Sequence, residues 1–221
     1  MDEDTVEDTV EDSVEGTVNN TVIDAVDKAV EGADTMHLAC CFTGYRPEKY
    51  KFDIDGDSSD ATVLKVKLAR YVNELISKGV TEFYCGCARG FDIFAAEAVL
   101  EAKKYHPTTK LISVMPFRDM NRGWEPGWTD RLMRVLDQSD DIIVIADGYR
   151  RGVYDIRNRY MVDHSEYVIT YFDGAVGGTR NTLDYAKRKN RVVVNLADEE
   201  PLHPKVPDRY PVFVAEKLPF C

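Results

Sequence analysis

Residues 80–92 read VTEFYCGCARGFD. The apolar stretch Val80–Cys85 predicts a buried strand, and the residues after it form a glycine-rich turn that runs directly into a helix starting near Asp92. A strand, a glycine turn and a helix in direct succession are typical of a βα unit in a parallel sheet. Free backbone N–H groups gather at such a turn, and the helix dipole favours an anion there.

The same pattern repeats from His37 onward, where short apolar stretches alternate with amphipathic ones. This predicts an α/β fold with a doubly wound, mostly parallel sheet of about six strands, Rossmann-like in kind. The expected strands are Leu38–Thr43, Val80–Cys85, Lys110–Met115, Asp141–Ala146, Tyr167–Phe172 and Arg191–Leu196. The expected helices lie between a Ser58 cap and Gly79, and over residues 92–105, 128–138, 155–164 and 179–189.

The charges of the chain are unevenly distributed. Residues 1–34 hold twelve acidic residues and one basic residue, so the net charge of −11 lies in this segment and the remainder is neutral. Valine recurs at every fourth position from Val6 to Val30, and because a helix turns about 100° per residue these valines drift around its axis. We expect a disordered or weakly helical acidic tail over 1–35, a nucleotide-binding domain over 36–200 and a proline-rich C-terminal strap over 201–221. The alternative for the tail is a helix formed on an unknown protein partner.

Composition also bears on partners and location. A neutral folded part lacks a strongly basic face, which disfavours nucleic acid as a partner. No apolar stretch approaches the ~20 residues of a membrane span and the N-terminus is acidic, which predicts a cytoplasmic protein with no membrane partner. The sequence leaves open whether the protein forms a homo-oligomer.

The five cysteines are odd in number, which indicates reduced thiols. Four of them, Cys40, Cys41, Cys85 and Cys87, fall near the ends of strands expected to be neighbours. Adjacent strand residues point to opposite faces, so Cys40 and Cys41 do not share a tetrahedral centre easily, and we expect no metal site.

Three glycine turns are expected to meet at the carboxyl edge of the sheet, where doubly wound folds bind ligands. Glycine lets the backbone approach a ligand, and arginine grips a phosphate through two parallel hydrogen bonds. We expect valine at Gly90 or Gly178 to weaken nucleotide binding more than folding. The predicted ligand-binding residues are Gly44, Tyr45, Arg46, Gly86, Ala88, Gly90, Asp92, Arg118, Arg157, Gly177, Gly178 and Thr179.

For two further features of this region the sequence allows two interpretations. Asp92 is either the N-cap of its helix or a partner for ribose hydroxyls. After the third strand, Phe117, Trp124 and Trp128 form an aromatic stretch that is either a packing element or a surface on which a base stacks.

Phe42–Pro47, residues 86–97, residues 157–163 and Gly177-Gly178-Thr179 resemble the YpsA-like (YoqJ-like) branch of the SLOG superfamily, over about residues 37–197. That superfamily includes the Lonely Guy phosphoribohydrolases and the DNA-processing protein DprA, all with a Rossmann-like fold. The resemblance implies a nucleotide-type ligand, related to NAD or ADP-ribose, bound near Gly90, Asp92 and the Gly-Gly-Thr turn.

The sequence departs from the Lonely Guy pattern at two positions. Arg157 matches its arginine, but Asn158 stands where that family has a lysine, and Thr182 stands where it has the catalytic glutamate. Cleavage of an N-glycosidic bond needs a carboxylate. We therefore predict a module that binds or senses a nucleotide-derived ligand.

Two alternatives to this function stay open. The first is an N-glycosidic hydrolase, for which the candidate catalytic residues are Asp92, Arg157 and Asp163, with Asp173 as a further source of the carboxylate. The second is DprA-like binding of single-stranded DNA.

Overall fold

A computed structural model describes residues 38–56 and 58–198 of the chain. Strands and helices alternate through this part, as the sequence predicts. The strands are β1 Leu38–Thr43, β2 Val80–Cys85, β3 Lys110–Phe117, β4 Asp141–Ala146, β5 Tyr167–Thr170 and β6 Val192–Asn195. The helices are α2 Ser59–Ser77, α3 Phe91–Lys103, α4 Pro126–Gln138, α5 Val153–Asp163 and α6 Gly178–Arg188, with a 3-10 turn η1 at Pro47–Lys49. The predicted strand and helix positions are confirmed to within about two residues at most ends.

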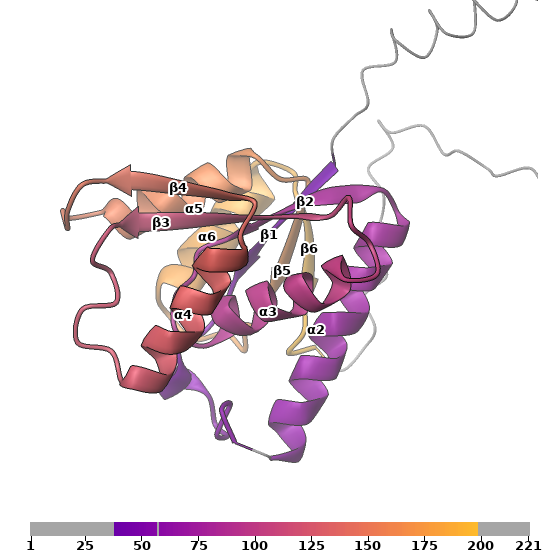
Figure 1. Cartoon of the computed structure of the whole chain (residues 1–221), viewed down its shortest axis with the longest axis horizontal. Coiled ribbons are helices and arrows are strands. Elements are labelled where there is room, and N and C mark those ends of the chain that lie inside the picture. Colours follow the sequence, from indigo (N-terminus) through magenta and orange to yellow (C-terminus); the bar gives the residue numbers. More distant parts are fainter. Residues whose placement is uncertain (1–37, 57, 199–221) are drawn as a thin grey trace, which may run out of the picture. The chain divides into compact units, whose positions relative to one another are not determined.

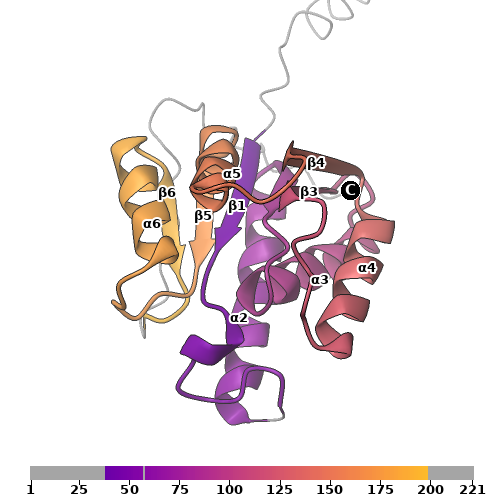
Figure 2. The same ribbon diagram turned by 90° about the vertical axis from the view of Figure 1, so that its left-hand side faces the viewer.

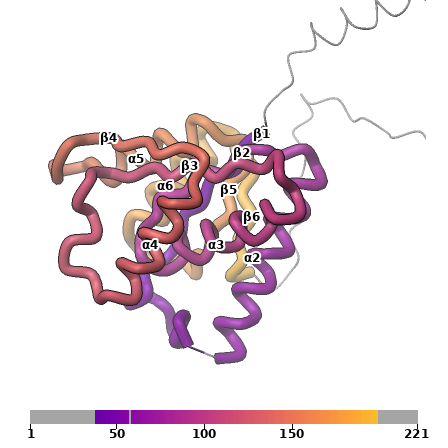
Figure 3. Tube along the Cα trace, viewed as in Figure 1, coloured from indigo at the N-terminus to yellow at the C-terminus, as the bar shows by residue number. Residues whose placement is uncertain are grey.

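The six strands form one parallel sheet in the order β4-β3-β2-β1-β5-β6. The chain first builds outward from β1 to β4, and α5 then carries it back to β5 on the other side of β1 (Figure 3). Strands β1 and β5 are paired from Cys40 opposite Tyr167 to Thr43 opposite Thr170. The direction of winding therefore changes between β1 and β5, which is the position where such sheets form a ligand crevice.

Helices cover both faces of the sheet. Helices α2, α3 and α4 lie on one face, and α5 and α6 lie on the other (Figures 1 and 2). Each face has its own buried core, because successive side chains of a strand point to opposite sides. Cys40 belongs to the first core and Cys41 to the second, and Cys85 and Cys87 lie with Cys40. The four thiols therefore do not converge on one centre.

The ends of α2 follow from local chemistry. The Ser58 side chain caps the helix by accepting a hydrogen bond from the Ala61 N–H at 3.2 Å. Leu64, Leu68 and Leu75 form its buried face. Gly79 follows the helix with φ +91°, a conformation that glycine adopts without strain.

Two predictions concern residues that the structure does not describe. The acidic tail and the proline-rich strap both lie outside residues 38–198, and their domain boundaries stay predictions. Within the described residues, every helix falls short of the combination of length and apolar character that a membrane span requires.

Candidate functional site

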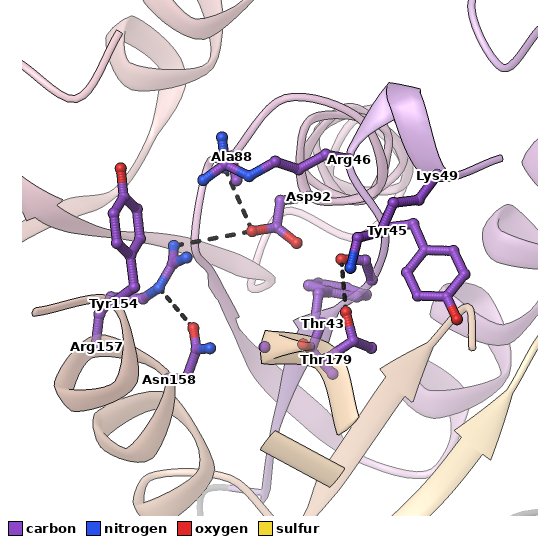
Figure 4. Close-up of a pocket in the computed structure, with 13 residues that line it drawn as sticks. Thr43, Tyr45, Arg46, Lys49, Ala88, Asp92, Tyr154, Arg157, Asn158 and Thr179 are labelled. Carbon is purple, nitrogen blue, oxygen red and sulfur yellow. Dashed lines mark hydrogen bonds and ion pairs between the residues drawn. The ribbon is translucent and has the colours of Figure 1, made fainter. Parts of the chain in front are cut away.

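A cleft of about 160 Å³ opens at the carboxyl ends of β1 and β5, the change of winding direction described above. Side chains from α5 form one wall, and the turn after β1 and the start of α6 form the other (Figure 4). Asp92 and Arg46 lie between the two walls. The lining residues are Phe42, Thr43, Gly44, Tyr45, Arg46, Lys49, Ala88, Asp92, Tyr154, Arg157, Asn158, Gly178 and Thr179.

Tyr45 fixes the loop between β5 and α6. Its side chain is buried, and its hydroxyl donates to Asp173 Oδ1 at 2.6 Å and accepts from the Ala175 N–H at 3.1 Å. The hydrogen bonds from Tyr45 and Lys51 lower the pKa of Asp173. Asp173, a candidate carboxylate from the sequence, is outside the cleft lining and serves to hold this loop.

The glycine turn before α3 is closed by the protein itself. Gly90 is the N-cap of α3 with φ +88°, and a Cβ there would lie 2.6 Å from the Tyr45 carbonyl oxygen. That carbonyl accepts the Phe91 N–H at 3.1 Å. A Cβ at Gly86 would collide with the Arg157 side chain. Both glycines are therefore required by packing, and the Ala88 and Phe91 N–H groups of this turn already have acceptors within the protein.

The turn before α6 is open. Gly177 is the N-cap, and the backbone N–H groups of Gly178, Thr179 and residue 180 have no acceptor among residues 38–56 and 58–198. A Cβ at Gly178 would contact nothing within 4 Å. The Thr179 hydroxyl donates to the Gly44 carbonyl at 3.1 Å, which joins this turn to β1. The Lys49 ammonium lies close to Gly177, so a cation accompanies the open amides.

Asp92 and Arg157 form a buried pair beneath the cleft. Their side chains are 8% and 5% exposed, and Arg157 Nη1 lies 3.8 Å from Asp92 Oδ2. Asp92 Oδ2 also accepts the Ala88 N–H at 3.3 Å. Asp92 lies within the first turn of α3, whose N-cap is Gly90, so it is not the N-cap of this helix. Arg157 donates to the Gly86 carbonyl and, through Nε, to Asn158 Oδ1 at 2.8 Å. Burial raises the pKa of Asp92, an effect that Arg157 opposes.

Asn158 connects this pair to α6. Its amide nitrogen donates to the Thr182 hydroxyl at 2.9 Å, and that hydroxyl donates to the Gly178 carbonyl at 2.9 Å. Thr182 stands where the resembling hydrolases have their glutamate, and here it is buried and only 3% exposed. Among the thirteen lining residues, Asp92 alone carries a carboxylate.

Some predicted site residues lie elsewhere. Arg118 is exposed in the turn after β3 and is not part of the cleft lining. Asp163 is at the far end of α5, where it accepts hydrogen bonds from Lys189 at 2.7 Å and Tyr185 at 2.9 Å. Gly86, Gly90 and Gly177 border the cleft without lining it.

Sequence reasoning missed Lys49 and Tyr154 as lining residues, and it noted Asn158 only as a departure from the family pattern. Tyr154 lies three residues before Arg157 on α5, and residues three apart share a helix face. That spacing was available in the sequence. Nothing in the sequence indicates that Lys49 reaches the start of α6.

The chain matches the YpsA family, described as the YspA SLOG family, over residues 40–195. A Bacillus subtilis (strain 168) protein, the uncharacterized SPbeta prophage-derived protein YoqJ, is 36% identical over 138 residues, which are 57% of this chain and 81% of that protein. A UPF0398 protein of Leuconostoc citreum is 25% identical over 169 residues, covering 72% and 87% of the two chains.

Among solved structures, DNA processing protein A from Helicobacter pylori superposes with a TM-score of 0.51 at 17% identity. The superposition covers 72% of this chain and 65% of that one. A similarity at this identity establishes a shared fold.

Proposed function

Because the chain belongs to the YspA SLOG family, we propose that it binds a nucleotide-derived ligand whose phosphate lies against the start of α6. The observation that carries this proposal is the contrast between the two glycine turns. At the turn before α3 the Ala88 and Phe91 N–H groups have acceptors within the protein, whereas the N–H groups of Gly178 and Thr179 have none among the described residues. Free amides at a helix N-terminus favour a phosphate. Arg46 and Lys49 add positive charge to the same cleft.

The remaining lining groups suit a ribose and the edge of a base. Asp92 offers a carboxylate to ribose hydroxyl groups, the role that an acidic residue has in dinucleotide-binding folds. The Tyr154 ring stands at the cleft with the Arg46 guanidinium 5.5 Å from its centre. NAD, ADP-ribose and nucleoside monophosphates all share the phosphate and ribose that these groups fit.

Replacing Gly178 with valine should weaken binding of a nucleoside monophosphate about 10- to 100-fold, because the side chain would keep the phosphate from charge-assisted hydrogen bonds with the backbone. Titration calorimetry with AMP measures this. Gly127→Val is the matched control, since Gly127 also lies in the first turn of a helix and a Cβ there contacts nothing within 4 Å. Equal binding by the wild type and Gly178→Val would remove α6 from the site.

We further propose that the ligand is bound without appreciable hydrolysis. Binding rests on amides and cations that exchange no proton, whereas hydrolysis needs a placed carboxylate, and Thr182 supplies a hydroxyl. Incubation with AMP and with NAD, followed by chromatography, should show no free base or nicotinamide. Turnover near ~1 to 1,000 per second would contradict this. Loss of that turnover in Asp92→Ala would then identify Asp92 as the carboxylate.

Single-stranded DNA binding is the second candidate. DNA processing protein A from Helicobacter pylori, which has a similar fold, has a single-stranded DNA binding mode, and a strand phosphate suits the same amides and cations. The neutral charge of residues 35–221 disfavoured nucleic acid, but the local charge at the cleft is cationic. Anisotropy with an oligodeoxynucleotide separates the candidates, because strand binding falls steeply with salt as several phosphates release counterions.

A further inference from the structure

Three aromatic rings form a row that starts at the cleft. Tyr154 lines the cleft, and its ring centre is 5.9 Å from that of Phe117. Phe117 in turn is 5.9 Å from Tyr149, again edge to face. Tyr149 is 72% exposed. The row, which we call the aromatic row, therefore leads from the candidate phosphate site to the open surface.

The aromatic stretch in the sequence divides into two parts in the structure. Trp128 is 7% exposed and packs edge to face on Phe94, so it belongs to the core. Trp124 lies under the Arg89 guanidinium, which is 5.9 Å from its ring centre. Phe117 is the member that reaches a lining residue. The two tryptophans are therefore packing elements. The interpretation as a surface for base stacking applies to Phe117 and its aromatic neighbours.

The two loops that adjoin the residues of the aromatic row in the chain are positively charged. Residues 118–122 after β3 and residues 147–152 after β4 contain four exposed arginines. Within the described ranges, none of these four side chains has a hydrogen bond or an ion pair. The same loops contain the two acids Asp119 and Asp147, so their net charge is positive while the folded part is neutral. The four arginines are Arg118, Arg122, Arg150 and Arg151.

We propose that the aromatic row and these arginines form a subsite for a second nucleotide unit of the ligand, with its base on Tyr149 and its phosphate near the arginines. This inference rests on the proposed function. The cleft volume of about 160 Å³ is below the ~300 Å³ of a typical small-molecule pocket, so a ligand of two nucleotide units has to extend beyond it. Every base offers a π-face to an exposed tyrosine, and unpaired arginines attract the linking phosphates.

The experiment compares ligands of one and two units on the full chain. AMP is the one-unit probe, and NAD and the phosphodiester-linked dinucleotide pApA are the two-unit probes, which distinguish a dinucleotide cofactor from a nucleic-acid strand. Tyr149→Ala should weaken binding of at least one two-unit probe about 5- to 100-fold, the usual loss for one stacked base, and leave AMP binding unchanged. Tyr149→Phe should retain the affinity, because stacking does not use the hydroxyl.

Tyr105→Ala is the matched control, since Tyr105 is 76% exposed just after α3 and outside the aromatic row. Both tyrosines are exposed, and thermal melts should show all variants folded. If Tyr149→Ala binds both NAD and pApA as tightly as the wild type does, the subsite is overturned. It is also overturned if the wild type binds AMP as tightly as it binds NAD and pApA. In either case the AMP result leaves the proposed function standing. Wild-type protein that binds none of the three probes would overturn both.

Discussion

Replacing Arg157 with methionine should destabilise the protein by about 3 to 5 kcal/mol at neutral pH, the usual loss when one partner of a buried ion pair is removed. The change leaves the Asp92 carboxylate buried without its compensating charge. It also removes the donor to the Gly86 carbonyl and to Asn158. Urea unfolding of the wild type and the variant measures the difference.

The loss should depend on pH in a defined direction. Burial raises the pKa of Asp92 in the folded state above its ordinary value of 3.8, so ionisation of Asp92 lowers stability as the pH rises through that window. Arg157 lowers the pKa of Asp92, so without Arg157 this pKa is higher and the loss of stability continues to a higher pH. The deficit of Arg157→Met should therefore be smaller near pH 4 than at pH 7, and an equal deficit at both would contradict the charge explanation.

A double-mutant cycle separates the charge from the lost packing. Asp92→Asn removes the buried charge with little change of shape, so in the Arg157→Met background it should restore part of the stability. In the wild-type background Arg157 already offsets part of the cost of that buried charge, so the same change should raise stability less or not at all. If the two substitutions are strictly additive, the pair at 3.8 Å contributes no coupling energy.

Replacing Gly90 with valine should cost about 3 to 5 kcal/mol of folding stability, from a strained backbone and an overpacked contact together. The φ of +88° is a conformation that valine rarely adopts. Its Cβ would lie 2.6 Å from the Tyr45 carbonyl and 3.0 Å from Pro47, both parts of the turn after β1. We therefore expect Gly90 and Gly178 to differ in their effect on folding, although the sequence predicts the same behaviour for both.

Thermal and urea unfolding of Gly90→Val, Gly178→Val and the wild type give the measurement. Gly178→Val should unfold close to the wild type, since a Cβ there contacts nothing within 4 Å. If Gly90→Val is as stable as the wild type and loses only AMP binding, the turn before α3 approaches the ligand directly. If both valine variants unfold early, Gly178 has a structural role that its open surroundings do not show.

Many of the residues that line the cleft could be predicted from the sequence, because they come directly after strands. Gly44, Tyr45 and Arg46 come directly after β1, and Gly178 and Thr179 open the helix after β5. The carboxyl ends of parallel strands meet at one edge, so these turns were expected to converge. The structure places Asp163 at the end of α5 beside Lys189, whereas the α5 residues that line the cleft lie near the start of that helix.

The sequence by itself determined the alternation of strands and helices, the parallel sheet and the glycine turns, because hydrophobic periodicity and turn chemistry are local properties. Only the tertiary structure decided which backbone donors of these turns have acceptors within the protein. The Ala88 and Phe91 N–H groups donate to the Asp92 carboxylate and the Tyr45 carbonyl, and the N–H groups of Gly178 and Thr179 have no acceptor among the described residues. Whether a backbone donor is satisfied depends on acceptors that lie far away in the chain, and folding alone brings them together.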